Sequence, residues 1–189
     1  MTFRPSIPNP PPLALTSKGD GLYREVRTPA HVGIPEVFVG LDHKFIDTEA
    51  IWDTGATGTV IDAQLAARMK LPPTGKALVR HAQGEEEVNT YIIDIALPMR
   101  VGFREVRVVE GRLGNCGLLI GMDIIATGDM SLTHENGNSV FSFRLPPAQN
   151  PIDYVVEINE RRARDAAKQH KSSFWTPPPN FKKRKRRKR

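Results

Sequence analysis

The sequence predicts an all-β fold, either a sandwich or a barrel of short strands. Short stretches of alternating or β-branched apolar residues recur through residues 22–145. Turn signals rich in glycine, proline, asparagine and aspartate separate these stretches at regular intervals. Only one part of that region has convincing helical spacing. Many short, evenly spaced strands with little helix are typical of β-sandwiches and barrels.

The expected strands follow from alternation and from the turn residues that bound them. Residues 45–52 alternate most clearly and end at Asp53. Residues 81–87 form a polar connection with one glycine, as expected for the tip of a projecting hairpin, and residues 135–138 form a hairpin turn of the Asn-Gly type. The expected strands are residues 22–27, 36–39, 45–52, 59–61, 76–80, 88–97, 103–109, 131–134 and 139–145, with the most apolar segment at 118–125.

One short helix is expected directly after the strand at 59–61. Asp62 stands where an N-cap residue belongs, and Leu65, Ala66 and Met69 recur at helical spacing. Two prolines at 72 and 73 then end the helix. The sequence therefore predicts a helix over residues 63–70.

Charge and composition divide the 189 residues into three parts. Residues 1–20 are an expected proline-rich N-terminal arm, residues 21–147 an expected folded domain, and residues 148–189 a charged C-terminal extension. Residues 157–189 hold 13 Lys and Arg against three Asp and Glu, although the whole chain carries only +6. The run from Lys182 to Arg189 is entirely basic and repels itself, so the basic character belongs to a tail.

Other features exclude several classes of function. The single Cys116 cannot form an intramolecular disulfide, and we expect a small buried side chain there rather than a nucleophile. The five histidines lack metal-ligand spacing, so no metal or other cofactor is expected. We see no signal peptide and no apolar run long enough for a membrane span. These features predict an intracellular protein, and we expect it in the cytoplasm.

The strongest chemical signal is the acid that follows the strand at 45–52. Asp53 ends an apolar run, Gly55 permits a tight turn, and a second apolar run begins at Thr59. Burial disfavours a carboxylate, so an acid in this place needs a reason. One reason is catalysis, and the other is a simple cap on a turn.

The stretch from Asp53 through Thr54, Gly55, Ala56 and Thr59 to Ile61 resembles the active-site loop of retropepsin-like aspartic proteases. A second signature of that family, an aliphatic pair followed by glycine, is matched by Leu119-Ile120-Gly121. The form of this second motif is more similar to the DNA-damage-inducible and bacterial retropepsins than to the retroviral enzymes. The resemblance covers roughly residues 22–147 and implies a retropepsin-like acid protease barrel with one short helix after the Asp loop.

The resemblance also implies a homodimer and a mechanism. The chain contains one Asp-Thr-Gly, whereas peptide hydrolysis by this route needs two carboxylates. Two Asp53 side chains, one from each subunit, are therefore expected to activate a water that attacks a peptide bond. The remaining expected site residues form three groups: Thr54, Gly55 and Ala56 supporting the active-site loop; Thr57, Gly58, Ala82, Gln83, Gly84 and Ile120 binding substrate; and Thr59 and Gly121 as structural support.

Two departures from the retroviral pattern occur together. Retroviral enzymes have an acid after the alanine of the first motif and an arginine after the glycine of the second, and the two form an ion pair. Thr57 and Met122 occupy these positions here. The loop must therefore be held in another way.

Three alternatives remain open from the sequence. Sugar-kinase and actin ATPases also place Asp-x-Gly-x-Thr after a strand, but they need a much longer chain with a second glycine-rich motif. A retropepsin-fold dimer could bind peptide or a partner protein without cutting it. The basic tail from Lys182 to Arg189 could contact nucleic acid nonspecifically, either as the main function or as a tether.

Overall fold

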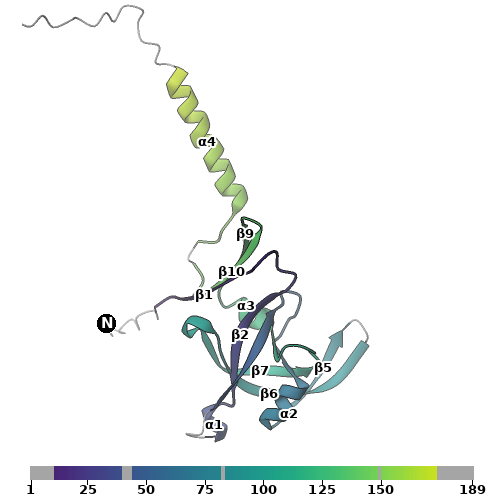
Figure 1. The fold of residues 1–189 in the computed structure, drawn as a ribbon. Helices are drawn as coiled ribbons and strands as arrows, with labels where there is room; N and C mark the ends of the chain where they lie inside the picture. Colours follow the sequence, from purple (N-terminus) through teal and green to yellow (C-terminus); the bar gives the residue numbers. More distant parts are fainter. Residues whose placement is uncertain (1–10, 40–43, 82–83, 149, 174–189) are drawn as a thin grey trace, which may run out of the picture. The chain divides into compact units, whose positions relative to one another are not determined.

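The computed structural model describes residues 11–39, 44–81, 84–148 and 150–173. The chain divides into two compact units, residues 1–148 and 149–189. The first unit is built almost entirely of strands in two sheets (Figure 1). Its elements are β1 (Leu13–Lys18), β2 (Val26–Gly33), α1 (Glu36–Val39), β3 (Phe45–Trp52), β4 (Val60–Asp62), α2 (Ala63–Met69), β5 (Gly75–His81), β6 (Gly84–Ala96), η2 (Pro98–Arg100), β7 (Gly102–Gly111), β8 (Leu118–Ile120), α3 (Met122–Ile125), β9 (Asp129–Glu135) and β10 (Asn138–Leu145).

The larger sheet closes into a barrel. Its seven strands are ordered β2-β3-β8-β4-β7-β6-β5, and β2 also pairs with β6 at residues 31–33. Strand β8 inserts between β3 and β4, parallel to β3 and antiparallel to β4. This crossover places Ile120 opposite Trp52, the last residue of β3. It therefore brings the two sequence motifs side by side.

The smaller sheet packs against the end of β3. Its order is β1-β10-β9, with all pairings antiparallel. Phe141 and Phe143 of β10 are fully buried, and their rings lie 5.0 and 4.9 Å from the ring of Trp52. The Trp52 indole nitrogen donates a hydrogen bond of 3.0 Å to the Thr28 hydroxyl. These contacts fix the strand end from which Asp53 follows.

The predicted helix after the Asp loop is confirmed as α2. The Asp62 side chain accepts a hydrogen bond of 3.0 Å from the backbone nitrogen of Gln64, as its predicted capping role requires. The same carboxylate accepts from the backbone nitrogen of Leu113. Leu65, Ala66 and Met69 are buried, so the predicted apolar face does pack into the core.

Two predicted strands are wrong. Residues 36–39 form the short helix α1, where the nitrogen of Phe38 donates to the oxygen of Pro35 and the chain reverses. The strand expected at 22–27 begins only at Val26 and continues through Pro29 to Gly33. Pro29 is tolerated because β2 meets its second neighbour, β6, only at residues 31–33, so the missing N–H at position 29 interrupts no pairing with β6.

The apolar segment 118–125 is not one strand. It divides into β8 and the helical turn α3, with Gly121 between them. The remaining predicted strands, at 45–52, 59–61, 76–80, 88–97, 103–109, 131–134 and 139–145, are all confirmed with ends that shift by up to four residues.

Part of the segment assigned to the N-terminal arm is a strand of the small sheet. Residues 13–18 form β1, which pairs along its full length with β10. Leu15 is 2% exposed and belongs to the core. Residues 1–10 lie outside the described part of the chain.

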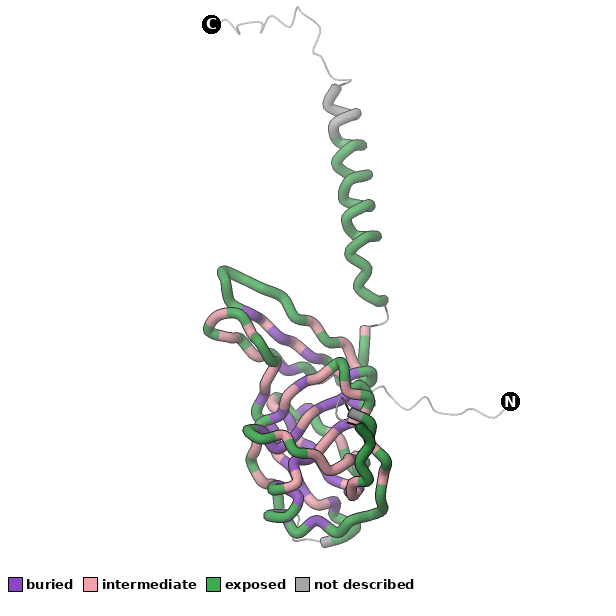
Figure 2. The backbone as a smooth tube through the Cα atoms, turned by 90° about the vertical axis from the view of Figure 1, so that its right-hand side faces the viewer, coloured by how far each residue is buried: buried purple, intermediate pink, exposed green. Residues whose placement is uncertain are grey.

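The second unit contains the helix α4 (Tyr154–Ser173). Every described side chain of this helix, from residue 154 to 168, is exposed, whereas buried residues fill the strand-rich unit (Figure 2). None of the described helices is long and apolar enough to cross a membrane.

Candidate active site

Asp53 follows β3 directly and is half-buried. Its backbone nitrogen donates a hydrogen bond of 3.0 Å to the carbonyl oxygen of Ile120. The acid is thus fixed to the second motif by its own backbone. Ile120 was also expected to contact substrate. Its side chain is fully buried here, and its contact with substrate stays a prediction.

A tight turn shapes the surroundings of the Asp53 carboxylate. One carboxylate oxygen, Oδ1, accepts a hydrogen bond of 2.8 Å from the nitrogen of Gly55. The nitrogen of Ala56 donates to the carbonyl oxygen of Asp53 at 3.3 Å. Thr54 and Gly55 are exposed, so the turn faces outwards with the acid at its base. A side chain at position 55 would place its Cβ 3.1 Å from Oδ1, which gives a reason for glycine there.

The second half of the loop lies against the second motif. The nitrogen of Met122 donates to the oxygen of Ala56 at 2.8 Å, and the nitrogen of Asp123 donates to the oxygen of Thr57 at 3.2 Å. Gly121 approaches so closely that a Cβ on it would lie 2.5 Å from the carbonyl carbon and oxygen of Gly58. The residues predicted as loop and as support, at 56–59 and 121, are therefore brought together.

Asp123 is a site residue that was not predicted from the sequence. Its carboxylate accepts hydrogen bonds from the backbone nitrogen and the hydroxyl of Thr59 at 3.0 and 2.8 Å. Thr57 and Met122 cannot form the retroviral ion pair, so the loop needs another fastening, and the Asp123 carboxylate lies where that fastening is needed. The signal was present in the sequence as a single acid inside the apolar run 118–125.

The hairpin predicted to cover the site is formed by β5 and β6. Ion pairs join its strands, with Lys76 bonded to Glu87 and Arg80 to Glu85. Gly84 has a φ of +133°, a conformation that favours glycine and lets the chain turn at the tip. Ala82 and Gln83, both predicted to bind substrate, lie outside the described residues.

Cys116 is buried, and burial raises the pKa of its thiol, which the nearby Arg27 guanidinium only partly offsets. The thiol is therefore protonated at neutral pH and is a poor nucleophile. The side chains described by the structure contain no group of three or more His, Cys, Asp or Glu that could hold a metal ion.

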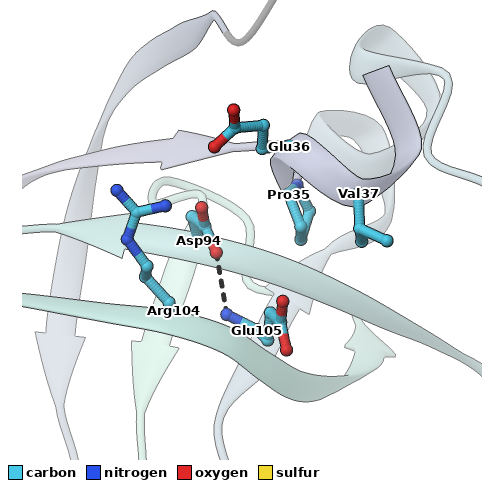
Figure 3. A pocket seen from close by; sticks show the side chains of 6 residues that line it. All are labelled: Pro35, Glu36, Val37, Asp94, Arg104 and Glu105. Carbon is cyan, nitrogen blue, oxygen red and sulfur yellow. Dashed lines mark hydrogen bonds between the residues drawn. The ribbon is translucent and has the colours of Figure 1, made fainter. Parts of the chain in front are cut away.

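Two cavities of the strand-rich unit are lined by residues outside the loop 53–59. One, of about 470 Å³, is formed by Pro35, Glu36, Val37, Asp94, Arg104 and Glu105 (Figure 3). Within it, the Asp94 carboxylate accepts a hydrogen bond of 2.7 Å from the nitrogen of Glu105. The other, of about 500 Å³, is lined by Thr48, Glu49, Asp62, Gln64, Leu65, Arg68 and residues 114–117.

Comparison with known proteins points to one family. Residues 42–127 match the family model described as gag-polyprotein putative aspartyl protease. That range includes both motifs of the site. A search of curated proteins found no match.

Three solved structures are similar to parts of this chain. A retropepsin-like aspartic protease from Rickettsia conorii is 11% identical, with 73% of this chain and 98% of that chain covered and a TM-score of 0.44. The EIAV protease in complex with the inhibitor HBY-793 is 17% identical, with 56% and 88% covered and a TM-score of 0.41. The retroviral protease-like domain of Ddi1 from Leishmania major is 18% identical, with 61% and 94% covered and a TM-score of 0.36.

The predicted resemblance to retropepsin-like aspartic proteases is confirmed by the family model. The predicted fold class, an all-β retropepsin-like barrel with a short helix after the Asp loop, is confirmed as well.

Proposed function

We propose that this protein is an aspartic endopeptidase that acts as a homodimer, with Asp53 of each subunit forming the catalytic pair. The observation that carries the proposal is the geometry of Asp53. It lies at the base of an exposed turn, fastened by its backbone to Ile120 and by its carboxylate to Gly55. One Asp-Thr-Gly per chain supports a second copy as the source of the other acid.

The chemistry follows from placing two carboxylates together. Two carboxylates at close range repel each other, so the pair retains one proton. One Asp53 is then a carboxylate and the other a carboxylic acid. The carboxylate removes a proton from a water, whose hydroxide adds to the carbonyl carbon of the peptide. The carboxylic acid gives its proton to the carbonyl oxygen. The newly protonated Asp53 gives its proton to the amide nitrogen while the other Asp53 takes one from a hydroxyl of the resulting diol, so the carbon–nitrogen bond breaks and the pair again holds one proton.

The remaining predicted residues have supporting roles in this proposal. By the resemblance, the Thr54 hydroxyls of the two subunits link the loops across the two-fold axis. Thr57, Gly58 and the hairpin tip at 82–84 hold an extended substrate by strand addition. Thr57 is exposed and Gly58 half-buried, which suits contact with a ligand.

The small sheet offers a surface for the second subunit. Strand β9 is at its edge, and Met130 and Leu132 are 36% and 45% exposed. They stand opposite Phe143 and Phe141 in the pairing register, so the apolar face beneath Trp52 continues to the edge of the sheet. An apolar edge strand is a ready site for pairing with another chain. This supports the proposed dimer.

A mixing experiment tests whether two copies form one site. Asp53→Asn subunits are added to a fixed amount of wild-type protein, under conditions in which all chains are dimeric and exchange partners. Because a mixed dimer has one carboxylate, we expect an equal amount of variant to lower the rate to about half, and a ninefold excess to about a tenth. The rate is measured with a fluorogenic peptide library.

A rate that does not change with added variant would show that each chain carries a complete site, and would refute the proposed pair. Wild-type dimers that bind peptide but never cleave it would instead support the silent, peptide-binding alternative.

The C-terminal unit favours a second role, contact with nucleic acid. The exposed side chains of α4 include Arg161, Arg162 and Arg164, but the helix has three acids against five Lys and Arg, so most of the positive charge lies in residues 182–189. Such a run binds phosphates without sequence preference. We expect the full chain to bind duplex DNA, with the logarithm of the binding constant falling linearly with the logarithm of the salt concentration. A chain that ends at Phe181 should lose this binding. Equal binding by the shortened chain, measured by fluorescence anisotropy, would contradict this role.

A further inference from the structure

Asp123 is joined to the active-site loop by its side chain and its backbone. The carboxylate accepts three hydrogen bonds, from the Thr59 nitrogen at 3.0 Å, the Thr59 hydroxyl at 2.8 Å and the Ile124 nitrogen at 2.9 Å. The backbone nitrogen of Asp123 donates to the oxygen of Thr57 at 3.2 Å. One residue thus holds the loop at two points, on both sides of Gly58.

Thr59 connects Asp123 to the rest of the site through further hydrogen bonds. Its side chain is buried, and its hydroxyl has one proton, which is donated to Asp123. The oxygen of that hydroxyl is then oriented to accept from the nitrogen of Gly121 at 3.2 Å. The carbonyl oxygen of Thr59 accepts from Val109 of the neighbouring strand β7. The carboxylate therefore fixes the direction of a hydrogen-bond chain that runs from Gly121 through Thr59 to Asp123.

These donors need a carboxylate at position 123, and a neutral side chain of the same shape cannot replace it. Thr59 presents two donors to two different oxygens of the carboxylate. An asparagine at position 123 has one oxygen and one NH₂ group, so one of the two Thr59 donors would face another donor. A buried donor without an acceptor is costly, and the loop would shift to relieve it.

We propose that Asp123 is a positioning residue for Asp53, whose carboxylate holds the loop 56–59 in the shape that the catalytic pair needs. This inference rests on the proposed function, because positioning matters only if two Asp53 side chains act together. It assigns to Asp123 the fastening that the ion pair supplies in retroviral enzymes. A small displacement of a reacting group can cost about 100-fold in rate.

The test combines kinetics with amide hydrogen exchange. Asp123→Asn should lower kcat by about 10- to 100-fold with a smaller change in KM, at protein concentrations where variant and wild type are equally dimeric. Thr59→Val removes the hydroxyl and should lower kcat by a similar factor. Thr59→Ser keeps the hydroxyl and should stay within about threefold of the wild type. The double variant should be no worse than the poorer single variant, because both changes break the same contact.

Hydrogen exchange separates this inference from the proposed function. In Asp123→Asn, the hydrogen-bonded amides of Ala56, Thr59, Gly121 and Met122 should exchange at least about tenfold faster, while those of the core strand β6 stay unchanged. If the wild type cleaves no peptide, the proposed function fails, and the exchange rates still decide whether Asp123 holds the loop. The inference is overturned if loop exchange is unaltered, or if kcat of Asp123→Asn stays within twofold of the wild type.

Discussion

Replacing Asp53 by asparagine should abolish peptide cleavage, with a loss of roughly 10⁴-fold or more, while the fold and the dimer remain. Asparagine has the size of aspartate and keeps an oxygen to accept from the Gly55 nitrogen, so the turn is preserved. It can neither remove a proton from water nor donate one to the carbonyl oxygen. Since the substitution replaces both members of the pair in a homodimer, acid and base catalysis are lost together.

The measurement is cleavage of a peptide library followed by mass spectrometry, with sedimentation to follow the dimer. Asp47→Asn is the matched control because Asp47 lies on β3, the strand that leads to Asp53, with its side chain 89% exposed, and the rate of this variant should stay within twofold of the wild type. The Asp53→Asn dimer should be at least as stable as the wild type, because asparagine removes the cost of holding a charged carboxylate beside a second acid. Cleavage retained by Asp53→Asn would place the chemistry elsewhere in the chain.

Gly121→Ala should destabilise the domain by about 3 kcal/mol and remove activity with it. The added Cβ would lie 2.5 Å from the backbone carbonyl of Gly58, and backbone atoms cannot move aside as the end of a flexible side chain can. The φ of Gly121 is −94°, which any residue adopts, so the whole cost comes from the contact between the two motifs. Relieving it would push the loop away from Gly121 and distort the turn at Asp53.

Gly58→Ala is the matched control for this variant. It adds the same methyl group on the other side of the same contact, where nothing lies within 4 Å. Its free energy of unfolding in urea should fall by less than about 1 kcal/mol. Equal stabilities for the two variants would show that the loop and the second motif are not packed as described.

Local patterns predicted the elements that position the acid. Strand β3 was predicted with its observed ends, because its alternation and the turn that follows both depend on adjacent residues. Helix α2 was predicted from the Asp62 cap and three apolar residues for the same reason. The two motifs were also recognisable, so their meeting across β8 could be expected from the family resemblance.

The elements and the residue role that were not predicted depend on partners distant in sequence. The apolar residues at 36–39 favour a strand, but the chain has to reverse there before β3 begins, and α1 makes that reversal. Nothing near Leu13 shows that its partner is Leu145. The role of Asp123 could not be read either, because an acid inside an apolar run acquires meaning only when Thr59 lies beside it.

The pairing of β1 with β10 bears on how the domain folds during synthesis. Thr16 is hydrogen-bonded to Ser142, 126 residues later, so β1 leaves the ribosome long before its partner exists. The two phenylalanines that pack on Trp52 arrive with that same late strand. The closure of so long a loop makes this sheet a late step, and contacts of this range slow folding. The support beneath the strand that leads to Asp53 is therefore completed last, after nearly the whole domain has been translated.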